Sequence, residues 1–229
     1  MHPPRRLVLR SMVLVCGLAS GFSCNASMAA SSPPNASQLT TFFKAVQFDD
    51  AKTVGAMLGT TVNANQPNPI GGEPGLVLAL REDAMQAFKV FLDHPGTNLE
   101  ARAANGNTAL MMAAYKRNRP ALEALLAKGA AVDQPGWTAL HYAAAVGDDE
   151  IVRMLLARGA QVDALSPKAS GAVTPMMMAA REGHDGTALL LIAQGADRNR
   201  TNTEGLNAVQ LAERAGKTRV AAALQRGAR

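Results

Sequence analysis

Cysteine is almost absent from this chain of 229 residues, and both copies, Cys16 and Cys24, lie close to its N-terminus. The rest of the chain therefore has no disulfide, no thiolate nucleophile and no cysteine ligand for a metal. Aromatic residues are scarce as well, since Phe, Trp and Tyr together make up 4% of the sequence. The apolar fraction is nevertheless 48%, and the composition is that of a folded soluble protein.

Catalytic and metal-binding motifs are also missing. The histidines beyond the N-terminal segment, His94, His141 and His184, follow no metal-ligand spacing. The sequence contains no Gly-x-Ser-x-Gly turn, and its glycine-rich stretch 71–75 lacks the Lys-Ser/Thr that completes a phosphate-binding loop. We therefore expect a protein that is not an enzyme and that holds no cofactor and no metal.

The formal charge of +5 does not indicate a nucleic-acid or membrane partner, because the N-terminal segment supplies most of it. Residues 1–29 contain Arg5, Arg6 and Arg10 and no acidic residue, which leaves 20 basic against 18 acidic side chains in the rest of the chain. We expect no nucleic-acid binding and no stable membrane anchor.

Residues 1–29 have the pattern of a signal peptide. The three arginines precede the apolar run 12–19, which is too short to cross a bilayer as a stable helix, and Ser27-Met28-Ala29 fits the small-x-small cleavage rule. An uncleaved anchor is the alternative. A cysteine-free exported chain rich in Ala, Gly and Arg indicates a bacterial protein of the periplasm, and secretion is the other destination.

Beyond the leader the chain repeats itself. Residues 30–37 include Ser-Ser-Pro-Pro-Asn and are expected to form a flexible linker. After this linker, helix starts recur with spacings of 34, 30, 36 and 33 residues, at Pro74, Thr108, Thr138, Thr174 and Asn207. We divide residues 38–226 into units of about 38–67, 68–100, 101–133, 134–163, 164–199 and 200–226.

The central units carry the residues that begin and end a helix pair. Hydroxyls that can cap a first helix stand at Thr108, Thr138 and Thr174. Glycines that can take the left-handed conformation close the second helix at Gly129, Gly159 and Gly195. Alanine pairs and leucines between these positions allow close helix packing. Because no unit can bury its apolar face alone, stacking of the units has to supply the core.

The pattern Gly-x-Thr-[Ala/Pro]-[Leu/Met]-x-x-Ala-Ala, followed by Leu-[Leu/Ile]-Ala-x-Gly-Ala, resembles the ankyrin repeat, strongly over 105–199 and loosely elsewhere in 38–226. The resemblance implies an all-α solenoid of about 5–6 helix–turn–helix units with short hairpin loops, which binds proteins without chemistry of its own. Three features depart from the pattern. Its histidine is kept only at His141, where it implies a hydrogen bond at the helix start; the loop 133–136 is short; and the loop 164–173 is long enough to project.

The resemblance also implies which side chains face the concave side of the solenoid, where a partner binds. These positions are Asn107, Met112, Tyr115, Lys116, Trp137, Tyr142, Val146, Met178, Arg181 and Glu182. They include the only Trp and both Tyr of the chain, and Trp, Tyr and Arg are the side chains that most often anchor protein interfaces. The alternative is that the aromatic residues are ordinary fillers of the repeat, covered by neighbouring units.

The sequence therefore favours a non-catalytic, monomeric module of the bacterial envelope that binds one protein through its concave face and hairpin tips. An immunity or regulatory protein that neutralises a toxin or an enzyme is the concrete form of this hypothesis. Two alternatives remain open. One is an accessory protein that supports a periplasmic enzyme in oxidative-stress defence, with a catalase-like partner; the other is an ankyrin effector directed at a host.

Overall fold

The computed structural model describes residues 33–226, and within this range the chain is helical. The predicted all-α class is confirmed, since the described residues form no strand beyond two isolated bridges. The helices are α1 (Ala36–Gln47), α2 (Ala51–Met57), α3 (Gly75–Arg81), α4 (Met85–Asp93), α5 (Ala109–Tyr115), α6 (Arg119–Ala127), α7 (Ala139–Val146), α8 (Asp149–Ala157), the short 3-10 helix η1 (Lys168–Ser170), α9 (Pro175–Glu182), α10 (Asp185–Ala193), α11 (Ala208–Arg214) and α12 (Thr218–Arg226).

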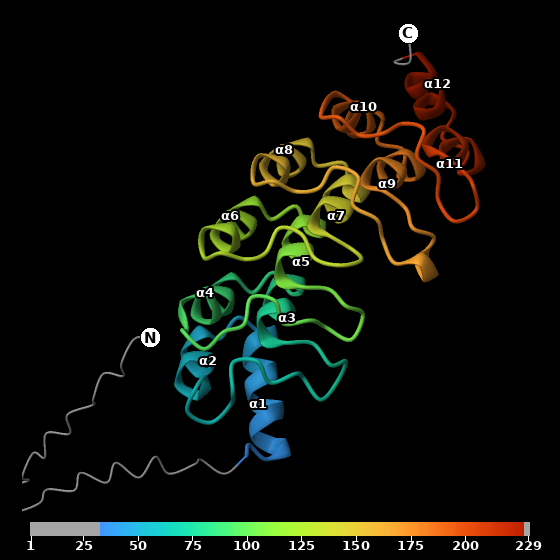
Figure 1. The fold of residues 1–229 in the computed structure, drawn as a ribbon. Coiled ribbons are helices and arrows are strands. Elements are labelled where there is room, and N and C mark those ends of the chain that lie inside the picture. Colours follow the sequence, from blue (N-terminus) through green and yellow to red (C-terminus); the bar gives the residue numbers. More distant parts are fainter. Residues whose placement is uncertain (1–32, 227–229) are drawn as a thin grey trace, which may run out of the picture. The chain divides into compact units, whose positions relative to one another are not determined.

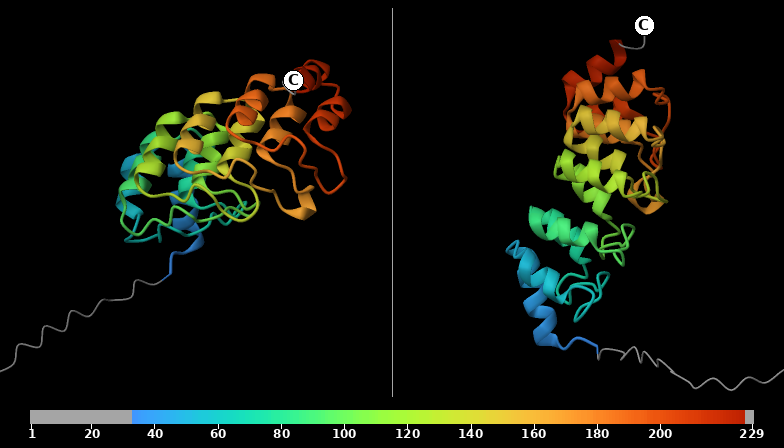
Figure 2. Two further views of the ribbon diagram at one scale, coloured as in Figure 1. Left: turned by 45° about the horizontal axis from the view of Figure 1, so that its top comes forward. Right: turned by 90° about the vertical axis from the view of Figure 1, so that its left-hand side faces the viewer.

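The α-helices of residues 33–226 form consecutive pairs that stack in chain order (Figures 1 and 2). The first helices of the pairs pack against one another in a row, formed by α1, α3, α5, α7, α9 and α11. The second helices form another row beside them. The contacts within the first row are more extensive from α5 to α11 than from α1 to α5. Loops between successive pairs extend from one side of the stack. The surface formed by the first helices and these loops is called the first-helix face below.

The helix α1 begins earlier than the sequence predicts. Ala36 and Ser37, expected to belong to the flexible linker, are already helical. Asn35 caps the helix: its Oδ1 accepts from the Gln38 backbone N–H at 2.9 Å, while the Gln38 side chain accepts from the Asn35 N–H at 2.9 Å. This capping box satisfies two backbone donors and fixes the start of the helix. The predicted signal peptide and the first linker residues lie outside the described residues.

The core consists of small and aliphatic side chains between the stacked pairs. Both members of the alanine pairs 113–114, 143–144 and 179–180 are fully buried, which allows α5, α7 and α9 to approach closely. Leu125, Leu155 and Leu191 on the second helices are fully buried as well. Burying one such leucine contributes about 2 kcal/mol. The stack therefore supplies the apolar burial that a single helix pair lacks.

Most of the predicted structural residues have the expected roles. The hydroxyls of Thr108 and Thr174 accept from the backbone N–H of Met111 and Met177 at 3.4 and 3.3 Å. The three glycines that close second helices all have left-handed φ angles, 91°, 88° and 94°, at Gly129, Gly159 and Gly195. Such angles are strained for residues with a Cβ atom, which explains why glycine recurs there.

The turn inside each of the helix pairs also contains a left-handed residue. It is glycine in the later pairs, at Gly147, Gly183 and Gly216, but Asp49, Asp83 and Arg117 in the first three. Each of these non-glycine side chains contacts the next pair. Asp49 accepts from the Ala87 N–H at 2.8 Å, Asp83 forms an ion pair with Lys116, and Arg117 donates to the Val146 carbonyl. These contacts offset the backbone strain of about 1 kcal/mol.

Carboxyl and amide side chains also connect successive units at the base of the loops. Each accepts a hydrogen bond from a backbone N–H of the following unit. The four links are Asn65 to Asn98 (2.7 Å), Glu100 to Ala131 (2.7 Å), Asp133 to Gln161 (2.8 Å) and Asp163 to Asp197 (3.0 Å). The recurrence of one link at the same position indicates that it fixes the register of the stack.

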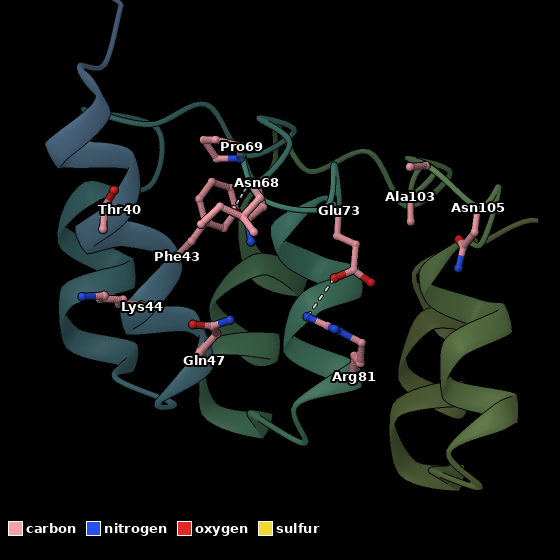
Figure 3. Close-up of a pocket in the computed structure, with 13 residues that line it drawn as sticks. Thr40, Phe43, Lys44, Gln47, Asn68, Pro69, Glu73, Arg81, Ala103 and Asn105 are labelled. Carbon is pink, nitrogen blue, oxygen red and sulfur yellow. Dashed lines mark hydrogen bonds and ion pairs between the residues drawn. The ribbon is translucent and has the colours of Figure 1, made fainter.

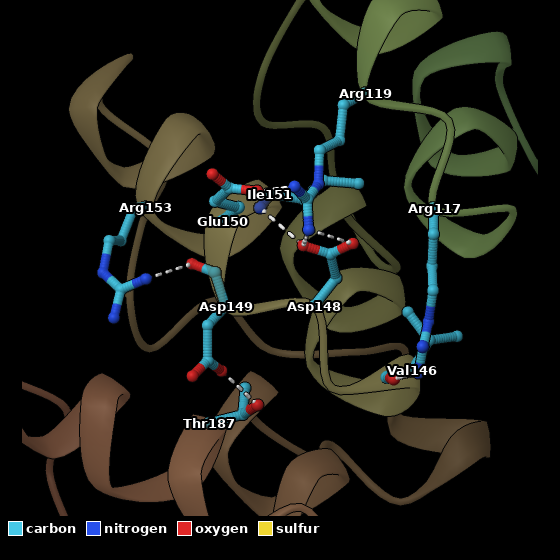
Figure 4. A network of polar contacts seen from close by, with 9 residues as sticks. All are labelled: Arg117, Arg119, Val146, Asp148, Asp149, Glu150, Ile151, Arg153 and Thr187. Atoms are coloured by element: carbon cyan, nitrogen blue, oxygen red, sulfur yellow. Dashed lines mark hydrogen bonds and ion pairs between the residues drawn. The ribbon is translucent and has the colours of Figure 1, made fainter.

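A polar network joins α6, α8 and α10 at the turns of their pairs (Figure 4). Asp148 is buried and caps α8, accepting from the Ile151 N–H at 3.0 Å. The Arg119 guanidinium lies between this carboxylate, at 3.2 Å, and that of Glu150. Asp149 accepts from the Thr187 hydroxyl at 2.6 Å. Since Arg119 and Thr187 belong to the pairs on either side of α8, these contacts link three successive units.

The two unusual loops pack against each other. The connection before α7, residues 128–138, is the shortest between any two described pairs, and the loop 158–174 is long and carries η1 at its tip (Figure 1). Pro167 of the long loop lies so close to Gly136 that a Cβ atom there would be 3.2 Å from the proline ring. The longer loop therefore packs against the short loop at this point.

Candidate protein-binding face

Three aromatic side chains of α5, α7 and the loop before α7 form a continuous cluster on the first-helix face. The Tyr115 and Tyr142 rings meet edge to face at 6.1 Å, and the Tyr142 and Trp137 rings lie 6.3 Å apart. We call these three residues the aromatic cluster. Tyr115 is the most accessible, with 54% of its surface exposed, while Trp137 and Tyr142 are half-buried. The structure thus brings together the aromatic residues that the sequence places on this face.

The buried ring of His141 packs against this cluster on its core side. The ring contacts Trp137 edge to face at 5.2 Å and is fully buried. Nδ1 accepts from the Thr138 backbone N–H at 3.2 Å, so the ring proton is on Nε2, which donates to the Val173 carbonyl at 3.0 Å. His141 thus makes a hydrogen bond at the start of α7, as the resemblance implies. Burial disfavours the charged imidazole and lowers its pKa from 6.5 to about 4.

Thr138 forms a capping box with His141 at the start of α7, and its hydroxyl also contacts the imidazole. This hydroxyl lies 2.9 Å from Nδ1 of His141, whereas Thr108 and Thr174 direct their hydroxyls to a backbone N–H. The difference follows from the imidazole, which offers an acceptor at this point, while the equivalent positions Met111 and Met177 offer only a thioether.

Tyr142 is held by a hydrogen bond to the preceding unit. Its hydroxyl donates to Asn107 Oδ1 at 2.5 Å. Desolvation by burial raises the pKa of the phenol, so it stays protonated and remains a donor at neutral pH. The ring is therefore fixed in orientation, which lowers the entropic cost of using it as a contact surface.

Three of the residues predicted to face a partner are buried instead. Asn107, Met112 and Met178 are only 8%, 7% and 9% exposed, so this part of the prediction is wrong. Asn107 lies at the start of α5 and is engaged by Tyr142, and the two methionines belong to the packed core between first helices. Tyr142 of the next unit contacts Asn107, and Arg181 of the same helix contacts Met178, which the repeat pattern does not show.

The remaining predicted residues line the edges of the cluster. Val146 is half-buried at the end of α7. Lys116 forms an ion pair with Asp83 at 2.6 Å and also donates to the Arg81 carbonyl at 3.1 Å. The exposed pair Arg181 and Glu182 on α9 is joined by an ion pair of 3.0 Å. The exposed residues of the predicted face are thus Tyr115, Arg181 and Glu182, while Trp137, Tyr142, Val146 and Lys116 are half-buried.

A pocket on the same face was missed by the sequence analysis. Its volume is about 480 Å³, and it lies between α1, α3 and the loops 68–73 and 103–105 (Figure 3). Ile70, at the tip of the first loop, is 84% exposed on its edge. An isoleucine between Pro69 and Gly71 is a signal that the sequence does carry, because such turns usually hold polar residues.

The described residues include no group of three or more His, Cys, Asp or Glu side chains that could hold a metal ion. Within the same range, none of the helices has the length and apolar character needed to cross a bilayer. What this part of the chain presents on the first-helix face is a contact surface, with an aromatic cluster, flanking charges and the pocket between α1 and α3.

Comparison with known proteins agrees with the helix-pair architecture. A model of three ankyrin repeats matches residues 42–134 and 76–166, and a model of a single ankyrin repeat matches residues 173–203. The chain belongs to the ankyrin-repeat family. Ankyrin repeats are a general protein–protein interaction module, and their domains are typically non-catalytic.

Similar ankyrin-repeat sequences occur in much longer proteins. Neurogenic locus notch homolog protein 1 of Xenopus tropicalis is 33% identical over 143 residues, which are 61% of this chain and 6% of that protein. Human SH3 and multiple ankyrin repeat domains protein 2 is 34% identical over 160 residues, 68% of this chain and 8% of that protein. The chain thus spans less than a tenth of the length of these relatives.

A solved structure shares the fold. The crystal structure of an ankyrin repeat domain from Acinetobacter baumannii AYE superposes with a TM-score of 0.68 at 22% sequence identity. The match covers 82% of this chain and 97% of the other.

Proposed function

We propose that this ankyrin-repeat protein is a non-catalytic binding module that recognises one protein partner through the aromatic cluster. The observation that supports the proposal is the cluster itself: the only tryptophan and both tyrosines of the chain lie together on the first-helix face. Rigid aromatic side chains contribute large contact areas at low entropic cost, and such residues dominate the binding energy of protein interfaces.

The proposed setting is the bacterial periplasm, and the proposed role is that of an immunity or regulatory protein. Support comes from the sequence of residues 1–29, which has the order of basic, apolar and small residues found in cleavable leaders. A protein that must neutralise a toxin or an enzyme needs only a contact surface, and the first-helix face supplies one.

Affinity capture from a bacterial envelope extract tests this function. The wild-type protein and a Tyr115→Ala variant are compared, because Tyr115 is exposed and its truncation leaves the core intact. A Leu189→Ala variant on α10 serves as the control, since Leu189 is an exposed apolar residue on a second helix. We expect the wild type and the control to retain one protein, and Tyr115→Ala to retain at least about tenfold less of it.

The captured protein is then identified and its binding measured with purified components. Equal retention by all three proteins would contradict the assignment of the aromatic cluster, and absence of any retained protein would contradict the proposed function in the envelope. Folding of each variant is checked by circular dichroism and by its urea midpoint.

A further inference from the structure

We infer that the pocket between α1 and α3 binds a short segment of the protein partner that combines an aliphatic residue with an adjacent acidic residue. The inference rests on the proposed function in one respect, namely that the ligand is a protein. It adds the chemistry of the segment that is recognised.

The pocket is rich in hydrogen-bond donors that have no acceptor among residues 33–226. Oδ1 of Asn68 accepts from the Ile70 N–H at 3.0 Å, and Oδ1 of Asn105 accepts from the Asn107 N–H at 3.1 Å. These bonds orient both amides and leave each Nδ2 group as a donor. Figure 3 shows the Asn68 amide between Phe43 and Glu73, with its nitrogen turned toward the pocket. A ligand that fits this site presents oxygen atoms as acceptors.

One lysine of the pocket offers a positive charge to a ligand. Arg81 lines the pocket and pairs with Glu73 and with Glu82, at 3.0 Å in each case. Lys44 of α1 also lines the pocket and has no carboxylate partner in the described part of the chain. Arg81 is engaged by these two acids, so the lysine is the cation available to a ligand. One acidic side chain beside the pocket complements it.

An apolar surface lies next to these donors. The Ile70 side chain stands on the edge of the pocket in a turn that is held by hydrogen bonds from the Ile70 and Gly72 N–H groups to Asn68. Gly71 and Gly72 have left-handed φ angles of 93° and 69°, which a turn of this shape requires. An isoleucine held outward by a defined turn gives an aliphatic side chain a fixed surface to pack on.

One hydrogen bond connects the pocket to the chain next to the aromatic cluster. Lys116 follows Tyr115 in the chain, and its ammonium group donates to the carbonyl of Arg81, a residue that lines the pocket. A partner that covers Tyr115 can therefore extend a segment over α3 toward α1. A volume of about 480 Å³ is within the range of about 300–1,000 Å³ that is usual for ligand pockets, and it holds two or three side chains.

A peptide titration tests the inference. The probe is the capped peptide acetyl-Ser-Leu-Asp-Leu-Ser-amide, added to the 15N-labelled protein while the backbone amide signals are followed. We expect shifts at Gln47, Ile70 and Asn105 that saturate, with a dissociation constant that rises with salt. The same peptide with Asn in place of Asp is expected to bind about tenfold more weakly, because hydrogen bonds to a charged acceptor are stronger.

Two variants test separately how the pocket binds the aliphatic and the acidic residue of the ligand. Ile70→Ser is expected to weaken binding of the probe at least fivefold, and Lys44→Glu at least tenfold, while both positions are exposed and tolerate substitution. Lys44→Glu is also expected to prefer the peptide with Lys in place of Asp. The matched control is Lys89→Glu, a charge reversal on the second helix α4, which should leave the affinity unchanged.

Three outcomes would overturn the inference: no shifts around the pocket at millimolar peptide, equal affinity for the Asp and Asn peptides, or equal competition by acetate alone. Failure here is distinguishable from failure of the proposed function. If Tyr115→Ala loses the captured partner while Ile70→Ser and Lys44→Glu keep it, binding through the aromatic cluster stands and the pocket has no part in it.

Discussion

His141 shows at the level of one residue how burial sets a pH dependence. The folded protein holds this imidazole neutral, with a pKa of about 4, whereas the unfolded chain has a pKa near 6.5. Between these values the unfolded state binds the extra proton, so the free energy of unfolding decreases as the pH falls. The loss starts near pH 6.5 and amounts to about 3 kcal/mol once the pH is below 4. Above pH 6.5 this residue causes no further change in the free energy of unfolding.

The variant His141→Met removes this pH dependence. Methionine occupies the equivalent position in the neighbouring units, at Met111 and Met177, so the side chain fits the repeat. We expect the variant to be less stable at pH 7.5, because it loses the bond to the Val173 carbonyl, but to lose less stability between pH 7.5 and pH 4.5 than the wild type does. Urea unfolding at both pH values measures the difference. Identical losses in the two proteins would contradict the account.

At the scale of the helix pairs, the turn between the two helices decides which glycines can be replaced. Gly147 and Gly216 both have φ angles of 70°, but their surroundings differ. A Cβ atom at Gly147 would lie 2.4 Å from Nδ1 of His184, the residue just before α10, and nothing lies within 4 Å of one at Gly216. His184 Nε2 donates to the Ala145 carbonyl at 3.0 Å, so displacing its ring breaks a link between units.

The pair of variants Gly147→Ala and Gly216→Ala separates backbone strain from packing. Both alanines incur the left-handed penalty of about 1 kcal/mol. Only the first also displaces His184, which adds about 1–2 kcal/mol through the broken hydrogen bond. Denaturant unfolding of both variants and the wild type measures the difference in the free energy of unfolding. Equal destabilisation of the two variants would show that the His184 contact contributes nothing to stability.

For the whole molecule, the sequence predicts the repeat well and the binding face only in part. Helix starts, left-handed glycines and the alanine pairs depend on contacts within a unit or on the same position in the next one, and these recur at a regular spacing. Asn107, Met112 and Met178 were misplaced because neighbouring side chains cover them. The pocket was missed because it arises where α1 and α3 pack less extensively than later first helices, and in the sequence only Ile70 in its turn marks it.

The central claim is that a protein partner covers the aromatic cluster, and Trp137 offers a direct test because it is the only tryptophan of the chain. Labelling with 5-fluorotryptophan gives the protein one 19F signal, which an unlabelled partner does not obscure. We expect this signal to shift or broaden when the captured partner is added, and to saturate at the stoichiometry of the complex. An unchanged signal at full saturation with the partner would contradict the claim.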